Sequence, residues 1–287
     1  MNIILENIYM STSQYKTSMR IALKIAYIGT EYHGFQIQPD VKTIEGELFR
    51  ALKELNIIND PREANYTGAG RTDKGVHALG QVIAFDTNAP ELAIPRIINS
   101  KLPPAIWVWA RSIAPQDFDP RRLALSREYR YILCGKFNIS VLRNASRLLK
   151  GTHDFANFST PEKDRSSICN VQNIDMRVER EFTIMDIQSD HFVWHMVRKI
   201  ATALKMMGYG ARDLSWLEQM LNPGEFTEGL EPAPAYGLIF EGVEYQNIYW
   251  DEDVYAKKSV RDELEGLFLW HGVMAEMIRE LKESLTV

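Results

Sequence analysis

Residues 68–85 constrain this chain most, because a loop with four glycines leads directly into an apolar strand. The segment reads Gly-Ala-Gly-Arg-Thr-Asp-Lys-Gly-Val-His-Ala-Leu-Gly-Gln-Val-Ile-Ala-Phe. Glycine lets a backbone turn tightly or approach a ligand closely, and residues 81–85 have the composition of a strand. We therefore expect Asp73 at the tip of a tight loop at the mouth of a sheet. Arg71 and Lys74 favour the ionised carboxylate, which could act as a nucleophile or as a base.

An ordinary surface turn with a weak Arg–Asp pair is the competing interpretation of this loop, and from spacing alone it is the more frequent outcome. No second carboxylate and no Cys or His cluster lies beside Asp73 in the sequence. The histidines at 33, 77, 153 and 195 do not have the spacing of metal ligands, so we expect no metal.

The composition is typical of a globular soluble protein with one large domain or two ordinary ones. The chain has 287 residues, of which 45% are hydrophobic and 25% charged. No apolar run of about 18 residues is present, so we expect no membrane helix. Residues 1–17 lack the pattern of a signal peptide and are interpreted as a loose extension. Cys134 and Cys169 form no disulfide framework, which favours a reduced, cytoplasmic compartment.

The net charge of −5 argues against a nucleic-acid partner, but the charge is unevenly distributed. Residues 111–165 contain 11 Lys and Arg against 6 Asp and Glu, and residues 251–287 contain 5 against 9. A basic middle segment can provide a phosphate-binding face inside an acidic total. The alternative is that these charge runs are simply solvated surfaces.

Strand and helix patterns alternate twice along the chain, which predicts an α+β fold. We expect an N-terminal half over 18–112, a C-terminal half over 113–250 and a helical tail over 251–287. The expected elements are strands at 18–27, 81–85, 106–110, 126–133, 174–180, 182–189 and 238–245, and helices at 44–55, 90–102, 141–150, 195–208 and 214–221. Thr43 is expected to cap the first helix, residues 152–158 to form a loop or short turn, and Gly208 to close its helix. The apolar stripe of the tail is expected to pack on the body rather than on a membrane or a partner.

Five separated segments and a closing one match a single family pattern in order. They are Tyr27-Ile-Gly-Thr…Gly34-Phe-Gln36, Gly70-Arg-Thr-Asp-Lys-Gly-Val-His-Ala78…Gly80-Gln81, Tyr129-Arg-Tyr131, Gly151-Thr-His-Asp-Phe155, His195-Met-Val-Arg198 and Ala233-Pro-Ala-Tyr-Gly-Leu238. On these residues the chain resembles the TruA family of tRNA pseudouridine synthases over about 21–245. It departs from the family at Ile28, where Asp is usual, at Phe35, where Trp is usual, and at Lys74, where a small residue is common.

The resemblance implies two ferredoxin-like α+β halves that share a mostly antiparallel sheet, with the active cleft between them. It also implies isomerisation of uridine to pseudouridine at tRNA positions 38, 39 or 40, by a homodimer and without a metal or organic cofactor. Asp73 matches the essential carboxylate, which attacks either the base or the sugar. The alternatives are a non-catalytic tRNA-binding protein on the same scaffold and, more remotely, an RNA hydrolase.

The resemblance also implies roles for other residues. Arg71 matches an arginine that touches RNA near the extruded base, and Tyr129 matches a tyrosine that stacks on it, whereas Tyr131 is expected in the core. Arg198 pairs with Asp73 in one hypothesis and with a different carboxylate in the other. The residues in segments expected to contact tRNA are Leu79, Gly80, Gln81, Arg121, Arg122 and Arg165.

Overall fold

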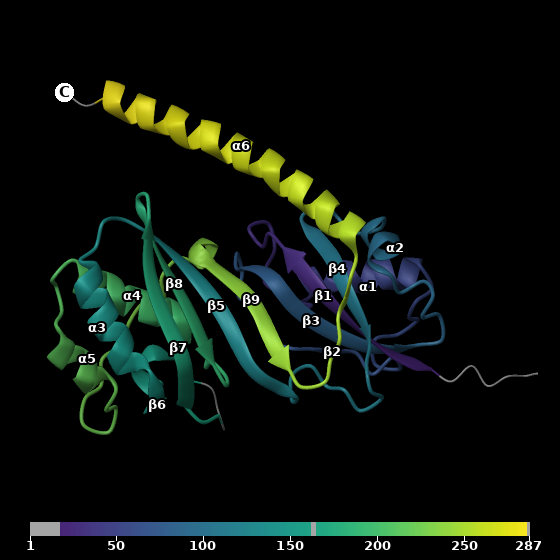
Figure 1. Cartoon of the computed structure of the whole chain (residues 1–287), viewed down its shortest axis with the longest axis horizontal. Coiled ribbons are helices and arrows are strands. Elements are labelled where there is room, and N and C mark those ends of the chain that lie inside the picture. Colours follow the sequence, from purple (N-terminus) through teal and green to yellow (C-terminus); the bar gives the residue numbers. More distant parts are fainter. Residues whose placement is uncertain (1–17, 162–164, 286–287) are drawn as a thin grey trace, which may run out of the picture.

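The computed structural model describes residues 18–161 and 165–285, and within them ten strands form a single sheet (Figure 1). The strand order is β10-β4-β1-β3-β9-β5-β8-β7-β6, with β2 paired to β3. Every strand pair is antiparallel except β3 and β9. The prediction of an α+β fold with a mostly antiparallel sheet is confirmed.

One end of the sheet is formed by β1 (Met19–Tyr27), β2 (Thr67–Gly68), β3 (His77–Thr87), β4 (Ile106–Ile113) and β10 (Asp251–Glu252). Helix α1 (Ile44–Glu54) begins as expected, since the Thr43 hydroxyl accepts a hydrogen bond from the Gly46 N–H. Helix α2 (Pro95–Asn99) is much shorter than the predicted helix over 90–102. Proline disfavours a helical conformation in the residue before it, so the helix cannot extend upstream of Pro95.

The other end comprises β5 (Ala124–Cys134), β6 (Gly151–Asp154), β7 (Ile168–Glu179), β8 (Phe182–Ser189) and β9 (Leu238–Tyr245), with α3 (Ile139–Leu149), α4 (Met196–Gly208) and α5 (Leu214–Met220). The expectation of a loop or short turn over 152–158 is wrong for its first residues, which belong to β6, and agrees with the 3-10 turn Ala156–Phe158. β6 pairs with the start of β7, which is therefore longer than predicted. Helix α4 also includes Gly208, and Gly210, with φ +76°, supplies the left-handed residue beyond it.

The two ends of the sheet meet at the short parallel pairing of β3 with β9. His77 lies opposite Ile239 and Ala78 opposite Phe240. Gly80 is required here, because a Cβ atom at this position would lie 2.5 Å from the carbonyl oxygen of Glu241. The Asp73 loop enters β3 at this junction, so strand pairing fixes the loop between the two halves.

Helix α6 (Val254–Ser284) leaves the body and projects along one side of it (Figure 1). Its first turns are anchored, since Ala256 and Val260 are buried and Arg96 pairs with Asp253 at 2.9 Å. Beyond them the side chains are largely exposed, with Phe268 at 65% and Ile278 at 58%. The expectation that the apolar stripe packs on the body is therefore wrong. An apolar stripe predicts that something covers it, and cannot distinguish the chain's own body from another surface. No helix of the described residues is long and apolar enough to cross a membrane.

Candidate active site

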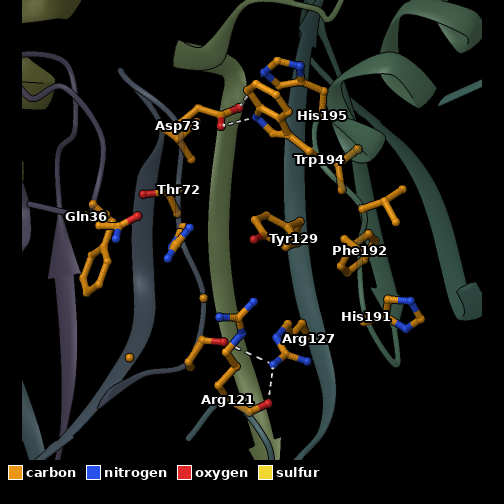
Figure 2. Close-up of a pocket in the computed structure, with 18 of the residues that line it drawn as sticks. Gln36, Thr72, Asp73, Arg121, Arg127, Tyr129, His191, Phe192, Trp194 and His195 are labelled. Atoms are coloured by element: carbon orange, nitrogen blue, oxygen red, sulfur yellow. Dashed lines mark hydrogen bonds and ion pairs between the residues drawn. The ribbon is translucent and has the colours of Figure 1, made fainter. Parts of the chain in front are cut away.

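A cleft of about 1530 Å³ lies between the two halves and contains Asp73 (Figure 2). Figure 2 shows Asp73, Trp194 and His195 at one end of the view, and Arg121 and Arg127 at the other. The ring of Tyr129 lies between these two groups. The cleft therefore combines a carboxylate, an aromatic surface and a cationic region.

The loop that carries Asp73 is held on both sides. The backbone of Phe35 donates to the carbonyl of Thr72 at 3.0 Å, and the N–H of Val76 donates to the Asp73 carbonyl at 3.2 Å. The Thr72 hydroxyl lies 2.7 Å from the buried phenol of Tyr27. Burial raises the pKa of Tyr27, so that phenol stays protonated and can donate to Thr72. These contacts hold the loop tip in one position.

Three side chains from the C-terminal half contact the Asp73 carboxylate. Arg198 Nη1 lies 2.8 Å from Oδ2, His195 Nε2 lies 3.3 Å from the same oxygen, and Trp194 Nε1 donates to Oδ1 at 3.1 Å. Arg198 is held in turn, because its Nε donates to the Ala233 carbonyl at 2.6 Å. Of the two hypotheses for Arg198, the structure shows the pair with Asp73. A loop whose acid contacts residues more than 120 positions away is not an isolated surface turn.

Trp194 and His195 were not assigned any role from the sequence. His195 belongs to a segment that carried the resemblance, but its contact with Asp73 depends on a left-handed backbone, with φ 67° and ψ 1°. The identity of one residue does not predict such a backbone conformation. The carboxylate also lies beside the N-terminus of α4, where the helix dipole favours negative charge.

Tyr129 lies on the aromatic surface of the cleft. Its ring packs edge-on against Phe192 with centroids 5.1 Å apart and tilted against Phe240 at 4.8 Å. Burial raises the pKa of Tyr129 to about 12, so the phenol is neutral at ordinary pH. Tyr131 is 2% exposed and donates to the Pro234 carbonyl, which places it in the core as expected.

The cationic region contains four of the predicted RNA contacts, Arg71, Arg121, Arg122 and Arg165, which all line the cleft. Arg127, which the sequence did not single out, organises this region. Its guanidinium donates to the carbonyls of Ala69, Arg121 and Asp190. Because Arg127 lies on a regular strand, only the tertiary structure shows that it links three separate segments.

Leu79, Gly80 and Gln81 do not line the cleft. Gly80 lies in the junction of β3 with β9. Gln81 is fully buried, and its amide donates to the carbonyl of Gly70 at 2.9 Å. A direct RNA contact by Gln81 is therefore incompatible with its burial in this structure. Its side chain supports the Asp73 loop through this hydrogen bond to Gly70.

A cysteine, a histidine and an aspartate lie in a row beside the cleft. Cys169 Sγ is 3.5 Å from His191 Nε2, and His191 Nδ1 is 3.0 Å from Asp190. Burial raises the pKa of Cys169 to about 11, and its side chain is 1% exposed. A protonated, inaccessible thiol is a poor nucleophile, so this row has no catalytic chemistry of its own. Among residues 18–161 and 165–285, no group of three or more His, Cys, Asp or Glu could hold a metal ion.

Comparisons with known proteins agree on one family. The family model described as tRNA pseudouridine synthase matches residues 24–121 and 145–246. The chain is 57% identical over 265 residues to the tRNA pseudouridine synthase A of Methanosarcina mazei, covering 92% of this chain and 98% of that protein. It is 41% identical over 268 residues to the protein of the same name from Archaeoglobus fulgidus, covering 93% and 98%.

Likeness to solved structures is weaker. The chain in "Crystal Structure of a Cbf5-Nop10-Gar1 Complex" is 12% identical, with a TM-score of 0.32 over 63% of this chain and 54% of that one. A TM-score this low adds nothing to the family match.

Proposed function

The chain belongs to the tRNA pseudouridine synthase family, whose members are isomerases, and we propose that it converts uridine to pseudouridine in tRNA with Asp73 as the catalytic carboxylate. The observation that supports this most directly is the set of contacts at Asp73. Arg198 pairs with the carboxylate at 2.8 Å, and two further side chains lie within 3.3 Å of its oxygens. Attack by the carboxylate at the base and attack at the sugar both need an ionised, oriented carboxylate in a cleft.

The reaction needs no oxidant or reductant. The bond between N1 and C1′ breaks, a bond between C5 and C1′ forms, and one proton moves from C5 to N1. A uridine within a stem-loop must first leave its stack, at a cost of a few kcal/mol. We propose that Tyr129 stacks on the extruded base, which contributes roughly 1–3 kcal/mol, and that Arg71 fills the space the base vacates.

We propose that the substrate uridines lie at positions 38, 39 or 40 of the anticodon stem-loop. The family resemblance supports this choice, and the cationic region supports an RNA substrate. Arg121, Arg122 and Arg165 lie where phosphates flanking the extruded nucleotide could be neutralised. Cys134 and Cys169 are free thiols, which supports the proposed cytoplasmic location.

The test is to incubate the protein with unmodified tRNA and map pseudouridine by carbodiimide-dependent stops in primer extension. We expect stops within positions 38–40 for the wild type and none for Asp73→Asn, with tRNA affinity and thermal midpoint nearly unchanged. Asp117→Asn, which changes an exposed aspartate outside the cleft, is the matched control and should keep full activity. A non-catalytic tRNA-binding protein would bind tRNA and give no stops even for the wild type. Stops of wild-type intensity with Asp73→Asn would refute the role of Asp73.

We propose further that two copies associate through α6. Side chains on a 4-3 spacing form one stripe of this helix and its C-cap residue Leu285. The stripe is apolar except at one position and comprises Val260, Leu264, Leu267, His271, Met274, Ile278, Leu281 and Leu285. This spacing, sustained over more than three heptads, is typical of a helix that packs on another helix. Seven apolar side chains on the stripe and the positions that flank it are exposed: Leu264, Phe268, Trp270, Met277, Ile278, Leu281 and Leu285. At roughly 100 Å² each they offer on the order of 700 Å², near the roughly 800 Å² per partner of a standard interface.

Two substitutions on the same helix test this association. Leu281 lies on the stripe and is 57% exposed, whereas Leu269 lies on the opposite face and is 59% exposed. In sedimentation at micromolar concentration we expect a dimer for the wild type and for Leu269→Glu, and a monomer for Leu281→Glu. A wild type that sediments as a monomer, or equal effects of both substitutions, would refute the proposal. Retention of a monomeric wild type by lipid vesicles or by another protein would assign the stripe to that partner instead.

A further inference from the structure

His195 has an unusual backbone at the mouth of the cleft. Its φ of 67° lies in the left-handed region, which costs a residue other than glycine on the order of 1 kcal/mol. The other non-glycine residues with positive φ in the described chain are four Asn or Asp residues, which like His are enriched in this region, and Arg180 in the turn between β7 and β8. His195 is also the N-cap of α4, yet its side chain makes no capping hydrogen bond. The backbone is strained and the cap is unused, so the imidazole is directed elsewhere.

The imidazole connects Thr160 to Asp73. Its Nδ1 lies 2.8 Å from the hydroxyl of Thr160, and its Nε2 lies 3.3 Å from Oδ2 of Asp73. Thr160 is itself fixed, because its backbone N–H donates to the carbonyl of Trp194 at 3.0 Å. The hydroxyl therefore reaches the ring from a defined direction.

The contacts with Asp73 and Thr160 together determine which nitrogen of His195 carries the proton. Burial lowers the pKa of His195 by more than the Asp73 carboxylate raises it, and Arg198 and Lys199 lower it further, so at pH 7 the ring is neutral and has one N–H. A carboxylate oxygen only accepts, so the favourable tautomer has its proton on Nε2. In that tautomer Nδ1 is an acceptor, and the Thr160 hydroxyl is the donor that satisfies it.

The two oxygens of Asp73 are held unequally. Among the described residues, Oδ2 faces both Arg198 and His195, whereas the side chain that donates to Oδ1 is Trp194, which is 45% exposed. Two donors that converge on Oδ2 fix the plane of the carboxylate. Oδ1 is left with a single donor on an exposed side chain that an incoming nucleotide can displace.

We propose that His195, held in its Nε2–H tautomer by Asp73 and fixed in place by the Thr160 hydroxyl, is a positioning residue that anchors Oδ2 of Asp73 and leaves Oδ1 to face the substrate. This inference rests on the proposed role of Asp73. Thr160 contacts His195 and not the carboxylate itself, so it acts on Asp73 through the imidazole. No part of this role requires Thr160 to touch RNA.

The test removes only the hydroxyl of Thr160. Thr160→Val keeps the size of the side chain, and we expect kcat to fall about tenfold while KM and the affinity for tRNA stay within twofold, because the loss of one donor costs about a factor of ten. Thr160→Ser keeps the hydroxyl and should restore most of the rate. Ser159→Ala is the control, because that neighbouring hydroxyl donates to the carbonyl of Ala156 and does not contact His195.

A second readout does not depend on activity. Nitrogen-15 chemical shifts of the histidine rings report the tautomer and the hydrogen bond that the other nitrogen accepts, and we expect Nε2–H for His195 in the wild type and a displaced Nδ1 resonance in Thr160→Val. Wild-type kcat in Thr160→Val, or an Nδ1 resonance unchanged by it, would overturn the inference. A wild type that forms no pseudouridine, but whose Nδ1 resonance still depends on Thr160, would overturn the proposed function and support the contact.

Discussion

Arg198 offers the sharpest test of how the carboxylate is held. We predict that Arg198→Gln lowers the rate of pseudouridine formation by roughly ten- to a hundredfold. The Arg198 and Asp73 side chains are 13% and 29% exposed, and their atoms lie 2.8 Å apart. A hydrogen bond to a charged group in such a setting contributes about 1.5–3 kcal/mol, and about 1.4 kcal/mol corresponds to a factor of ten. The rate of Arg198→Lys should fall between those of the wild type and Arg198→Gln, because one ammonium group cannot reach both Asp73 and the Ala233 carbonyl.

The assay is a single turnover with saturating enzyme, which separates the chemical step from tRNA binding and product release. Arg212→Gln is the matched control, because Arg212 pairs with Glu228 at the same 2.8 Å but lies outside the cleft. We expect this control to change stability slightly and the single-turnover rate not at all. A rate for Arg198→Gln within twofold of the wild type would refute the argument that this ion pair positions Asp73.

Three further outcomes follow from burial. Tyr129→Phe should retain most activity, because the phenol is neutral and the ring does the stacking, whereas Tyr129→Ala should lower kcat/KM by roughly ten- to a hundredfold in the same tRNA assay. Iodoacetamide at pH 8 should alkylate the exposed Cys134 and spare Cys169, whose pKa burial raises to about 11, as peptide mass mapping would show. Burial lowers the pKa of His77, so the unfolded state binds more protons below about pH 6.5, and the free energy of unfolding should fall between pH 7 and 5. Urea titration should show a weaker dependence for His77→Gln.

The features that were predicted correctly from the sequence are local. Thr43 caps α1 because a hydroxyl at that position satisfies a free N–H of the first turn, and this depends only on neighbouring residues. The first strand was recognised because β1 has a regular apolar pattern. The Asp73 loop was recognised as a tight turn because its glycines and its charges lie within eight residues, whereas only the resemblance of several separated segments favoured it over an ordinary surface turn. Each of these signals is complete within about a dozen positions.

The features that were missed depend on distant partners. Strand β6 exists because β7 is available to pair with it, and a four-residue segment has no pattern strong enough to show this alone. The two hypotheses for Arg198 could not be separated, because its acid lies 125 positions away. Gln81 matched a segment expected to touch RNA, but its side-chain amide donates a hydrogen bond to the Gly70 carbonyl in the Asp73 loop. Strand periodicity predicts which face a residue occupies and does not predict which loop covers that face.

The position of Asp73 at the junction of the two halves explains why the site needs both of them. The loop belongs to the N-terminal half, and Asp73 lies four residues before His77, where β3 begins to pair with β9. Strand β9 pairs along β5, which carries Tyr129, and the segment before β9 holds Arg198 through the carbonyl of Ala233. The distance between acid and arginine is therefore fixed by two residue pairs of parallel sheet. Contacts within the fold thus orient the carboxylate, and in the proposed reaction the binding energy of tRNA is left for extruding the base.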